Sequence, residues 1–337
     1  MSCFKYLSFF LILFCFLCQK PFAQTYNNEW IDFEQTYFKI KVAKSGLYRI
    51  PFSSLQNTTL PLTADGFQLY NKGKQVPIYL TTNGTLNSED YIEFYAEKND
   101  GQLDEQLFSD SSFQLSTVKS LFSDTAAYFL SWDNTDFNLR INKINNNLSI
   151  VPDAETHFQH RIDVVPNNQF FAGKGTTLED GKRLHFPDFE SGEGFVGLVI
   201  LEGNTKNYTL KTGEIYRDNA NVTTAQMSLK VVGQNDNLAL ENEHHVSVAV
   251  NGVPQNDFEY DGFGNYEKIF EVDLDILDDI QTMINVSSLA DVASTNRNSV
   301  AAVSIDYERT FNFEYLNHIL FSLENSTEKY LEITNFD

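Results

Sequence analysis

The stretch Asp90–Phe108, DYIEFYAEKNDGQLDEQLF, changes character in its middle. In its first half, Ile92 and Phe94 alternate with more polar neighbours. This period of two predicts a strand over 90–95 with one buried face. The second half is polar and carries a turn signal at Asn99-Asp100-Gly101. The stretch therefore predicts β structure interrupted by a turn.

The same alternation extends in both directions from this stretch. It predicts a hairpin over 30–50 that turns at Ser45-Gly46, and a second hairpin over 67–80 that turns at Asn71–Gly73. Short helical turns are expected within 103–123, and the glycine-rich, charged segment 171–194 is predicted to be a long loop. Further strands are predicted at 128–132, 139–144, 158–165, 196–201, 227–232, 245–250, 267–272, 283–286, 301–307, 319–323 and 330–333.

Strands at this spacing, joined by polar turns, predict an all-β fold of two consecutive β-sandwich-like domains. Three turn-favouring residues, Asn145–Asn147, mark the expected boundary between them. The first domain is then 24–147 and the second is 148–337. No catalytic α/β domain is expected in this chain.

Residues 1–23 have the pattern of an export signal. Lys5 precedes the apolar run Leu7–Cys18, and Pro21-Phe22-Ala23 follows it. The run is shorter than the ~20 residues that a membrane span needs, so the mature chain is predicted to have no span. Retention of this segment as an anchor is the alternative. We expect an exported protein, in the periplasm or at the cell surface.

All three cysteines, Cys3, Cys15 and Cys18, lie in the predicted signal. The mature chain therefore has no disulfide, no thiolate metal site and no cysteine nucleophile. The formal charge is 24 − 46 = −22. Nucleic acid as a partner is excluded, because phosphate binding needs a basic stripe.

Two groups of histidines are candidate metal ligands. His157 and His160 stand three apart, a spacing that suits two ligands on a helix, but their surroundings predict a strand, which turns them to opposite faces. Glu243-His244-His245 lacks the spacing of a zinc helix motif and stands at the start of a predicted strand. We expect exposed and half-buried histidines at both places.

Acidic residues form two further groups. Asn99, Asp100, Asp104 and Glu105 offer oxygen ligands to calcium, although their spacing differs from an EF-hand and a solvated turn is the alternative. The run Asp273–Asp279 is interrupted by apolar residues and is predicted to be a charged strand or turn edge. A glycosidase that uses two carboxylates is a further possible function, although the sequence singles out no specific pair of acidic residues for it. No catalytic, cofactor-binding or metal residue and no cofactor is predicted.

Several segments, in the same order along the chain, resemble the N-terminal β region of the gingipain-like cysteine peptidases, the family that includes the PorU-type sortases of the type IX secretion system. The segments are Trp30–Ile50, Gly66–Pro77, Asp90–Phe108, Asp124–Trp132, Gly192–Phe195 (GEGF, with Phe in place of the more usual Trp), His245–Gly252 and Ile305–Arg309.

The resemblance implies a caspase-like catalytic domain with a His/Cys dyad downstream of the β region. None of its catalytic positions is present in this sequence, so none is carried over. The chain is expected to be a non-catalytic accessory region of an exported peptidase, either a fragment or a shortened relative. Its expected partner is that downstream domain or another exported protein. The alternative is a free-standing β-sandwich module that binds a glycan or a protein.

Overall fold

The computed structural model describes residues 28–134, 138–145, 149, 151–177, 179–184, 187–291, 295–323 and 329–337. The predicted signal and its three cysteines lie outside these residues, as do Asn146, Asn147 and His185. The described part confirms the predicted all-β class. None of its helices is both long and apolar enough to cross a membrane.

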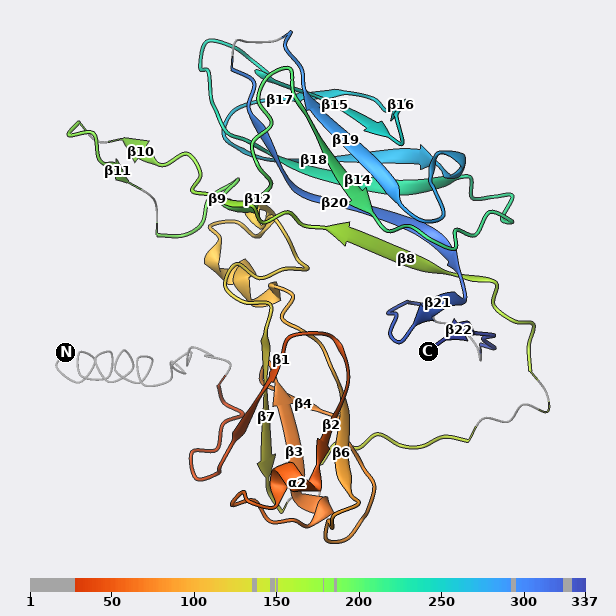
Figure 1. Cartoon of the computed structure of the whole chain (residues 1–337). Coiled ribbons are helices and arrows are strands. Elements are labelled where there is room, and N and C mark those ends of the chain that lie inside the picture. The colour runs from red at the N-terminus through yellow and green to blue at the C-terminus, as the bar shows by residue number, and fades with distance from the viewer. Residues whose placement is uncertain are drawn as a thin grey trace, which may run out of the picture. The chain divides into compact units, whose positions relative to one another are not determined.

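The chain divides into two compact units (Figure 1). The first unit contains the described residues up to Lys41, then Leu47–Tyr95 and Ala127–Asn142. The second contains Val42–Gly46, Ala96–Ala126 and Lys143–Asp337. The predicted domain boundary at 145–147 falls partly outside the described residues and stays a prediction.

Two sheets form the first unit. One has the strand order β1-β7-β3-β4 and the other β2-β6-β5. Phe94 of β6 lies 5.7 Å from Tyr128 of β7, ring centre to ring centre, so the buried faces of the two sheets meet. The elements are β1 (Phe38–Val42), β2 (Gly46–Pro51), helix α2 (Phe52–Leu55), the 3-10 turn η1 (Ala64–Gly66), β3 (Phe67–Asn71), β4 (Lys74–Val76), β5 (Tyr79–Leu80), β6 (Tyr91–Ala96) and β7 (Ala126–Trp132).

The first predicted hairpin is wrong in its pairing. Its two strands exist, but β1 pairs with β7 and β2 with β6, so they belong to different sheets. Alternation identifies a strand and its buried face, but it does not identify the partner. The second hairpin is confirmed as far as Val76, with Leu69 opposite Val76 and positive φ angles of 47° at Lys72 and 76° at Gly73 in its two-residue turn. Its predicted return to Leu80 is wrong, because β5 pairs with β6 in the other sheet.

The predicted strand over 139–144 is also wrong, because only an isolated bridge between Ile78 and Arg140 forms there. The Arg140 side chain explains the irregular backbone. Its Nη1 donates to the carbonyl oxygens of Phe67 and Leu139, and its Nη2 to those of Ala64 and Asp65, at 2.8–3.1 Å. The segment is therefore held by the Arg140 side chain and by two backbone hydrogen bonds with Ile78, rather than by a continuous ladder of backbone bonds.

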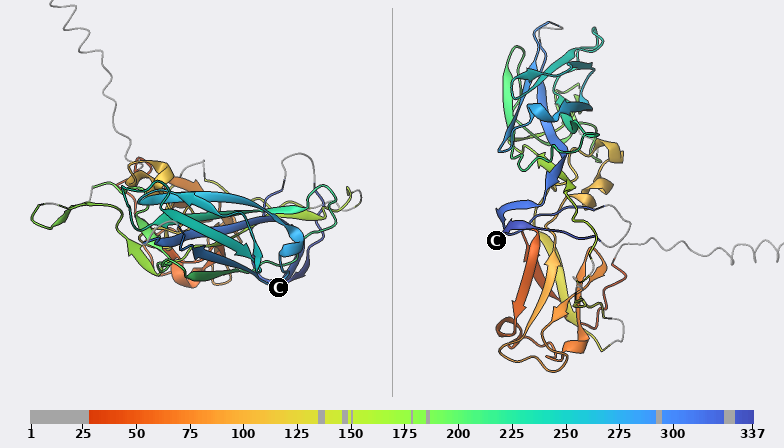
Figure 2. Two further views of the ribbon diagram at one scale, coloured as in Figure 1. Left: turned by 90° about the horizontal axis from the view of Figure 1, so that it is seen from above. Right: turned by 90° about the vertical axis from the view of Figure 1, so that its right-hand side faces the viewer.

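The second unit is a sandwich of two antiparallel sheets (Figure 2). One sheet has the order β18-β14-β20-β8, and the other β13-β19-β15-β16, with β17 also paired to β15. Their facing apolar side chains form one core, which includes Leu229, Ile305, Val248 and Ile284. The strands are β8 (His157–Val164), β13 (Thr205–Leu210), β14 (Thr224–Gly233), β15 (His244–Val250), β16 (Val253–Pro254), β17 (Phe258–Tyr260), β18 (Gly264–Asp273), β19 (Thr282–Ser288) and β20 (Asn298–Thr310).

Most strands of this sandwich are where the alternation predicts them, but the short strands β16 and β17 are not predicted from the sequence, and neither is β13. Its residues, TKNYTL, are mostly exposed at a sheet edge and carry little apolar signal. The acidic run after β18 contains the 3-10 turn η4 (Leu274–Ile276), and Leu274 and Leu277 enter the core. The charged residues of the run occupy a turn at the end of a strand, as predicted.

The remaining segments of the second unit are short. The predicted strand over 196–201 is wrong, because the strand found there, β12 (Gly194–Val196), shares only Val196 with it and pairs with β9 (Gln169–Phe171). The predicted loop before β12 contains the small hairpin β10 (Thr176–Thr177) and β11 (Arg183–Leu184). The helical turns expected within 103–123 are η2 (Gln102–Leu107) and η3 (Ser111–Phe113).

The predicted strands at 319–323 and 330–333 are wrong. Their apolar residues Ile319, Phe321, Leu323 and Leu331 pack on a cluster that includes Phe158 and Phe311, which accounts for the apolar signal without a strand. The parallel strands found in this region are β21 (Asn312–Leu316) and β22 (Thr334–Phe336).

Candidate binding groove

The first pair of candidate histidines lies on β8, as the predicted strand required. The His157 ring stacks on Tyr216 at 4.6 Å, and its Nε2 is 3.4 Å from a carboxylate oxygen of Glu308. His160 packs edge-on against Tyr307. Burial, with the nearby charge of Arg309, lowers the pKa of His160 to about 4. The two rings thus have separate surroundings and do not converge on one ligand.

The second group, Glu243-His244-His245, opens β15. Glu243 and His244 are fully buried, so the expectation of exposed or half-buried histidines is wrong for His244. Its ring stacks on Tyr260 and its Nε2 is 3.1 Å from the Asn235 carbonyl oxygen. Burial, and next the neighbouring carboxyl of Asp261, raise the pKa of Glu243.

His245 lies between two carboxylates. Its Nδ1 is 3.0 Å from Asp291 Oδ2 and its Nε2 is 3.0 Å from Asp257 Oδ2. An imidazole can donate from both nitrogens only when it is protonated. Burial alone lowers the pKa of His245, but Asp291 and Asp257 together outweigh it and raise the pKa.

The acidic turn considered for calcium has local partners. The Asp100 carboxylate accepts from the Gln102 N–H at 3.0 Å. Asp104 is buried and accepts from the Leu121 N–H at 2.7 Å. These carboxylates cap backbone groups of the turn and of the 120s segment. Throughout the described residues, no three His, Cys, Asp or Glu side chains are grouped to hold a metal ion.

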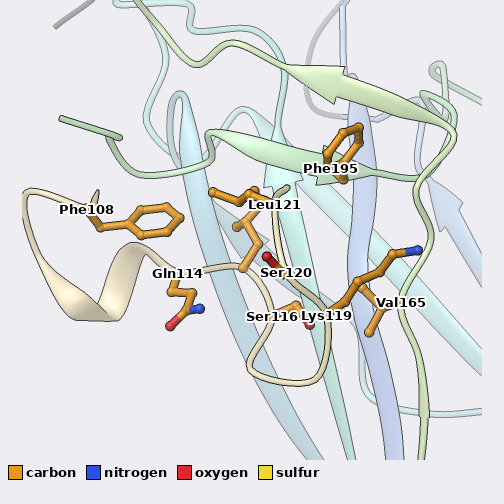
Figure 3. A pocket seen from close by; sticks show the side chains of 9 residues that line it. Phe108, Gln114, Ser116, Lys119, Ser120, Leu121, Val165 and Phe195 are labelled. Atoms are coloured by element: carbon orange, nitrogen blue, oxygen red, sulfur yellow. The ribbon is translucent and has the colours of Figure 1, made fainter. Parts of the chain in front are cut away.

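A small hollow of the second unit lies beside η2 and η3 (Figure 3). Its lining includes Phe108, Leu121 and Phe195. Its volume is about 20 Å³, room for roughly one water molecule. It is therefore a packing gap between the 100–121 segment and the sandwich rather than a ligand site.

A larger hollow, with a volume of about 250 Å³, is a groove over the outer face of the β18-β14-β20-β8 sheet. We call it the sheet groove. One of its walls is the irregular segment Leu115–Val118, and the other lining residues come from the sheet and the end of β8: Arg161, Asp163, Val165, Ser228, Lys230, Glu267, Ala302 and Ser304.

Strand register explains the shape of the sheet groove. Ser228 of β14 lies opposite Ser304 of β20, and Ala302 lies opposite Lys230. Directly opposed residues share a face of the sheet. The small side chains of Ser228, Ala302 and Ser304 on the two central strands thus make a low floor. Longer side chains on the flanking strands β18 and β8 rise beside it, from Glu267 and Asp163.

The charges in the walls are already paired. Lys230 Nζ is 3.5 Å from Glu267 Oε2 and donates to the Gln114 carbonyl oxygen at 3.3 Å. Ser228 Oγ donates to Glu267 Oε1 at 2.5 Å. Burial raises the pKa of the Glu267 carboxyl, but Ser228, Lys230 and Arg161 together outweigh it and lower the pKa.

The opposite wall has its own ion pairs. Arg161 Nε is 3.0 Å from Asp163 Oδ1, and Arg161 Nη1 is 2.9 Å from Asp306 Oδ2. Burial raises the pKa of Asp306. The formal charges of the lining residues sum to zero, because Arg161 and Lys230 are balanced by Asp163 and Glu267.

One floor hydroxyl has no partner. Ser304 is 2% exposed, and its Oγ makes no hydrogen bond. A buried hydroxyl without a partner costs about 1–3 kcal/mol. A molecule in the groove that offers a donor or an acceptor to Ser304 would remove this cost.

Sequence reasoning did not find the sheet groove. Its residues come from four strands and a turn that are far apart in the sequence. One local signal was available: the outward positions of two central strands carry the small residues Ser228, Ala302 and Ser304. Bulkier residues are commoner in strands, so small outward residues on adjacent strands indicate a depression.

Comparisons with known proteins give structural similarity only. No protein-family model matches the sequence, and no curated protein matches it. Dimeric latent PorU from Porphyromonas gingivalis is similar in structure, with 12% sequence identity and a TM-score of 0.47, over 82% of this chain. The chain spans 24% of that PorU chain.

Two carbohydrate-binding modules are similar over shorter stretches. One is the CBM36-1 domain of a xylanase from the hindgut metagenome of Trinervitermes trinervoides, with 12% identity and a TM-score of 0.26, covering 44% of this chain and 95% of that domain. The other is a family 35 module from Clostridium thermocellum, with 12% identity and a TM-score of 0.25, covering 42% of this chain and 90% of that module. At these values the similarities describe β architecture alone.

Proposed function

We propose that this chain is a non-catalytic accessory region of an exported gingipain-like cysteine peptidase, which shields, positions or presents a catalytic domain. The supporting observation is the place that the family-resembling residues take in the fold. They fasten segments of the β units together. When the residues that resemble the family hold the fold together and form no reactive site, the region suits a supporting role better than a catalytic one.

Asp90–Phe108 illustrates this framework role. Its first half is β6, with Ile92 and Phe94 fully buried in the first unit. In its second half, Gly101 has φ = 82°, and a Cβ there would lie 2.6 Å from the Lys119 carbonyl oxygen. Only glycine fits that turn without strain. Together with the Asp104 cap described above, it fixes η2 against the 119–121 segment.

Ile305–Arg309 on β20 has the same character. Ile305 and Tyr307 are core residues, and Arg309 is 3% exposed. Arg309 Nη1 donates to the Gly213 carbonyl oxygen at 3.1 Å, and its Nη2 lies 2.7 Å from Glu314 Oε2. The Tyr307 hydroxyl also donates to the Gly213 carbonyl oxygen, at 3.0 Å. These bonds tie β20 to the segment before β14 and to β21.

Residues 24–337 contain no cysteine, so a cysteine nucleophile would have to be supplied by another segment or another chain. The decisive experiment is to read the gene beyond codon 337. An in-frame caspase-like domain with a His/Cys pair is expected. A stop codon followed by unrelated genes would contradict the accessory role.

A binding module is the second candidate function. The sheet groove favours it, because the groove is open, lined by polar groups and contains an unpartnered buried hydroxyl. The two functions are compatible, since an accessory region can also bind a ligand. The groove can be tested without reference to any peptidase.

A further inference from the structure

We propose that the sheet groove binds a neutral saccharide of one or two sugar units, through hydroxyl groups that bond to its paired charges and to Ser304. This inference rests on the second candidate function and is independent of the accessory role. It follows from the charge, the hydrogen-bonding capacity and the size of the groove.

The charge of the groove argues for a neutral ligand. Each cation of the lining is held by a carboxylate at 2.9–3.5 Å. An anionic or cationic ligand would have to compete with these pairs and would leave a partly buried charge uncompensated. A neutral ligand can instead use the lone pairs and N–H groups that remain on the same side chains.

The hydrogen-bonding pattern argues for hydroxyl groups. Lys230 beside Glu267, and Arg161 beside Asp163, each place a donor next to an acceptor. A sugar hydroxyl donates and accepts at the same atom, so it can bond to both members of such a pair. The Ser304 hydroxyl, buried on the floor between the two walls, can pair with a third hydroxyl of the ligand.

The size of the groove limits the ligand. A volume of about 250 Å³ is room for several water molecules, which suits one or two sugar units. The lining has no aromatic ring, so stacking on a sugar face contributes nothing. We therefore expect weak binding, with Kd on the order of millimolar.

The test is saturation-transfer NMR on the full mature chain. The neutral probes are glucose, galactose, mannose, xylose and their common disaccharides. Glucuronate is the charged probe, and a Gly-Ser peptide is the polypeptide probe. Saturable transfer is expected to at least one neutral sugar, with less to glucuronate and to the peptide. Absence of transfer to every neutral sugar, or preference for the peptide, would overturn the proposal.

Variants locate the binding. Ser304→Val fills the floor and removes the hydroxyl, and is expected to weaken binding about tenfold. Lys230→Met keeps the aliphatic stem, removes one donor and gives a second measurement if Ser304→Val does not fold. Gln226→Ala is the control, because Gln226 is an exposed residue of β14 on the same sheet face but does not line the groove. Binding that survives both groove variants, or falls equally in the control, would refute the assignment.

Discussion

The contribution of the Arg140 hydrogen bonds to the stability of the first unit can be measured directly. Its guanidinium donates to four backbone carbonyl oxygens, those of Ala64, Asp65, Phe67 and Leu139. Arg140→Met keeps most of the stem and removes all four hydrogen bonds. A hydrogen bond from a charged group contributes about 1.5–3 kcal/mol when isolated. The bonds here share one half-exposed side chain, and water can replace part of them, so we expect a total loss of about 2–4 kcal/mol.

Tryptophan fluorescence reports on this unit alone. The chain has 2 tryptophans, Trp30 and Trp132, and both belong to the first unit. Urea unfolding followed by their emission therefore measures the stability of that unit. With a slope of about 1–2 kcal/mol per molar urea, the midpoint of Arg140→Met should fall by about 2 M.

Arg49→Met is the matched control. Arg49 belongs to the same unit and pairs with Glu93 at 2.8 Å, but its side chain is 56% exposed. Surface ion pairs contribute little, so its midpoint should stay within error of wild type. Equal midpoints for the two variants would refute the inference that the Arg140 bonds, rather than strand pairing, hold the 139–144 segment.

Three further predictions concern single side chains. Trp132 is half-buried and donates from Nε1 to the Thr63 carbonyl oxygen at 2.9 Å, so Trp132→Phe should destabilise the first unit by about 1 kcal/mol in urea unfolding; a stability equal to wild type would contradict this. Because the folded-state pKa of Glu243 is raised, the contribution of Glu243 to stability should be largest below its unfolded pKa and should be lost as the pH rises toward its folded pKa. Glu243→Gln should remove that slope and unfold at a higher temperature than wild type at pH 8 by calorimetry, and a lower temperature would count against it. The raised pKa of His245 likewise favours a bound proton in the folded state: its contribution is complete below its unfolded pKa of about 6.5 and is lost as the pH rises through the folded pKa. The difference in stability between wild type and His245→Gln should therefore shrink between pH 6 and pH 9. A difference independent of pH would exclude stabilisation by a protonated His245 between Asp291 and Asp257.

The residues through which this chain resembles an enzyme family do not form the candidate binding site. The residues behind the resemblance, such as Gly101, Asp104 and Arg309, close turns and join segments. The candidate binding site is built elsewhere, from Ser228, Ser304 and the ion pairs around them. The family motifs therefore do not identify the sheet groove.

The sequence by itself determined the class of the fold and most of its strands. Alternation at 91–96 and at 244–250 marks a buried face in each case, and the structure buries those faces. The two-residue turns at Lys72-Gly73 and Asn251-Gly252 can also be predicted from the sequence, because Gly73, Asn251 and Gly252 suit the positive φ angles that such turns require. These features depend on neighbours within a few residues.

Only the tertiary structure decided which strands pair, what satisfies Arg140 and where the sheet groove lies. β1 finds its partner β7 more than eighty residues later in the chain, and a period of two is the same whichever partner is chosen. The apolar run at 319–323 packs without forming a strand, because side-chain burial alone does not require a ladder of hydrogen bonds. The sheet groove requires small residues on β14 and β20 to be brought into register, and that register is fixed by packing of the opposite face.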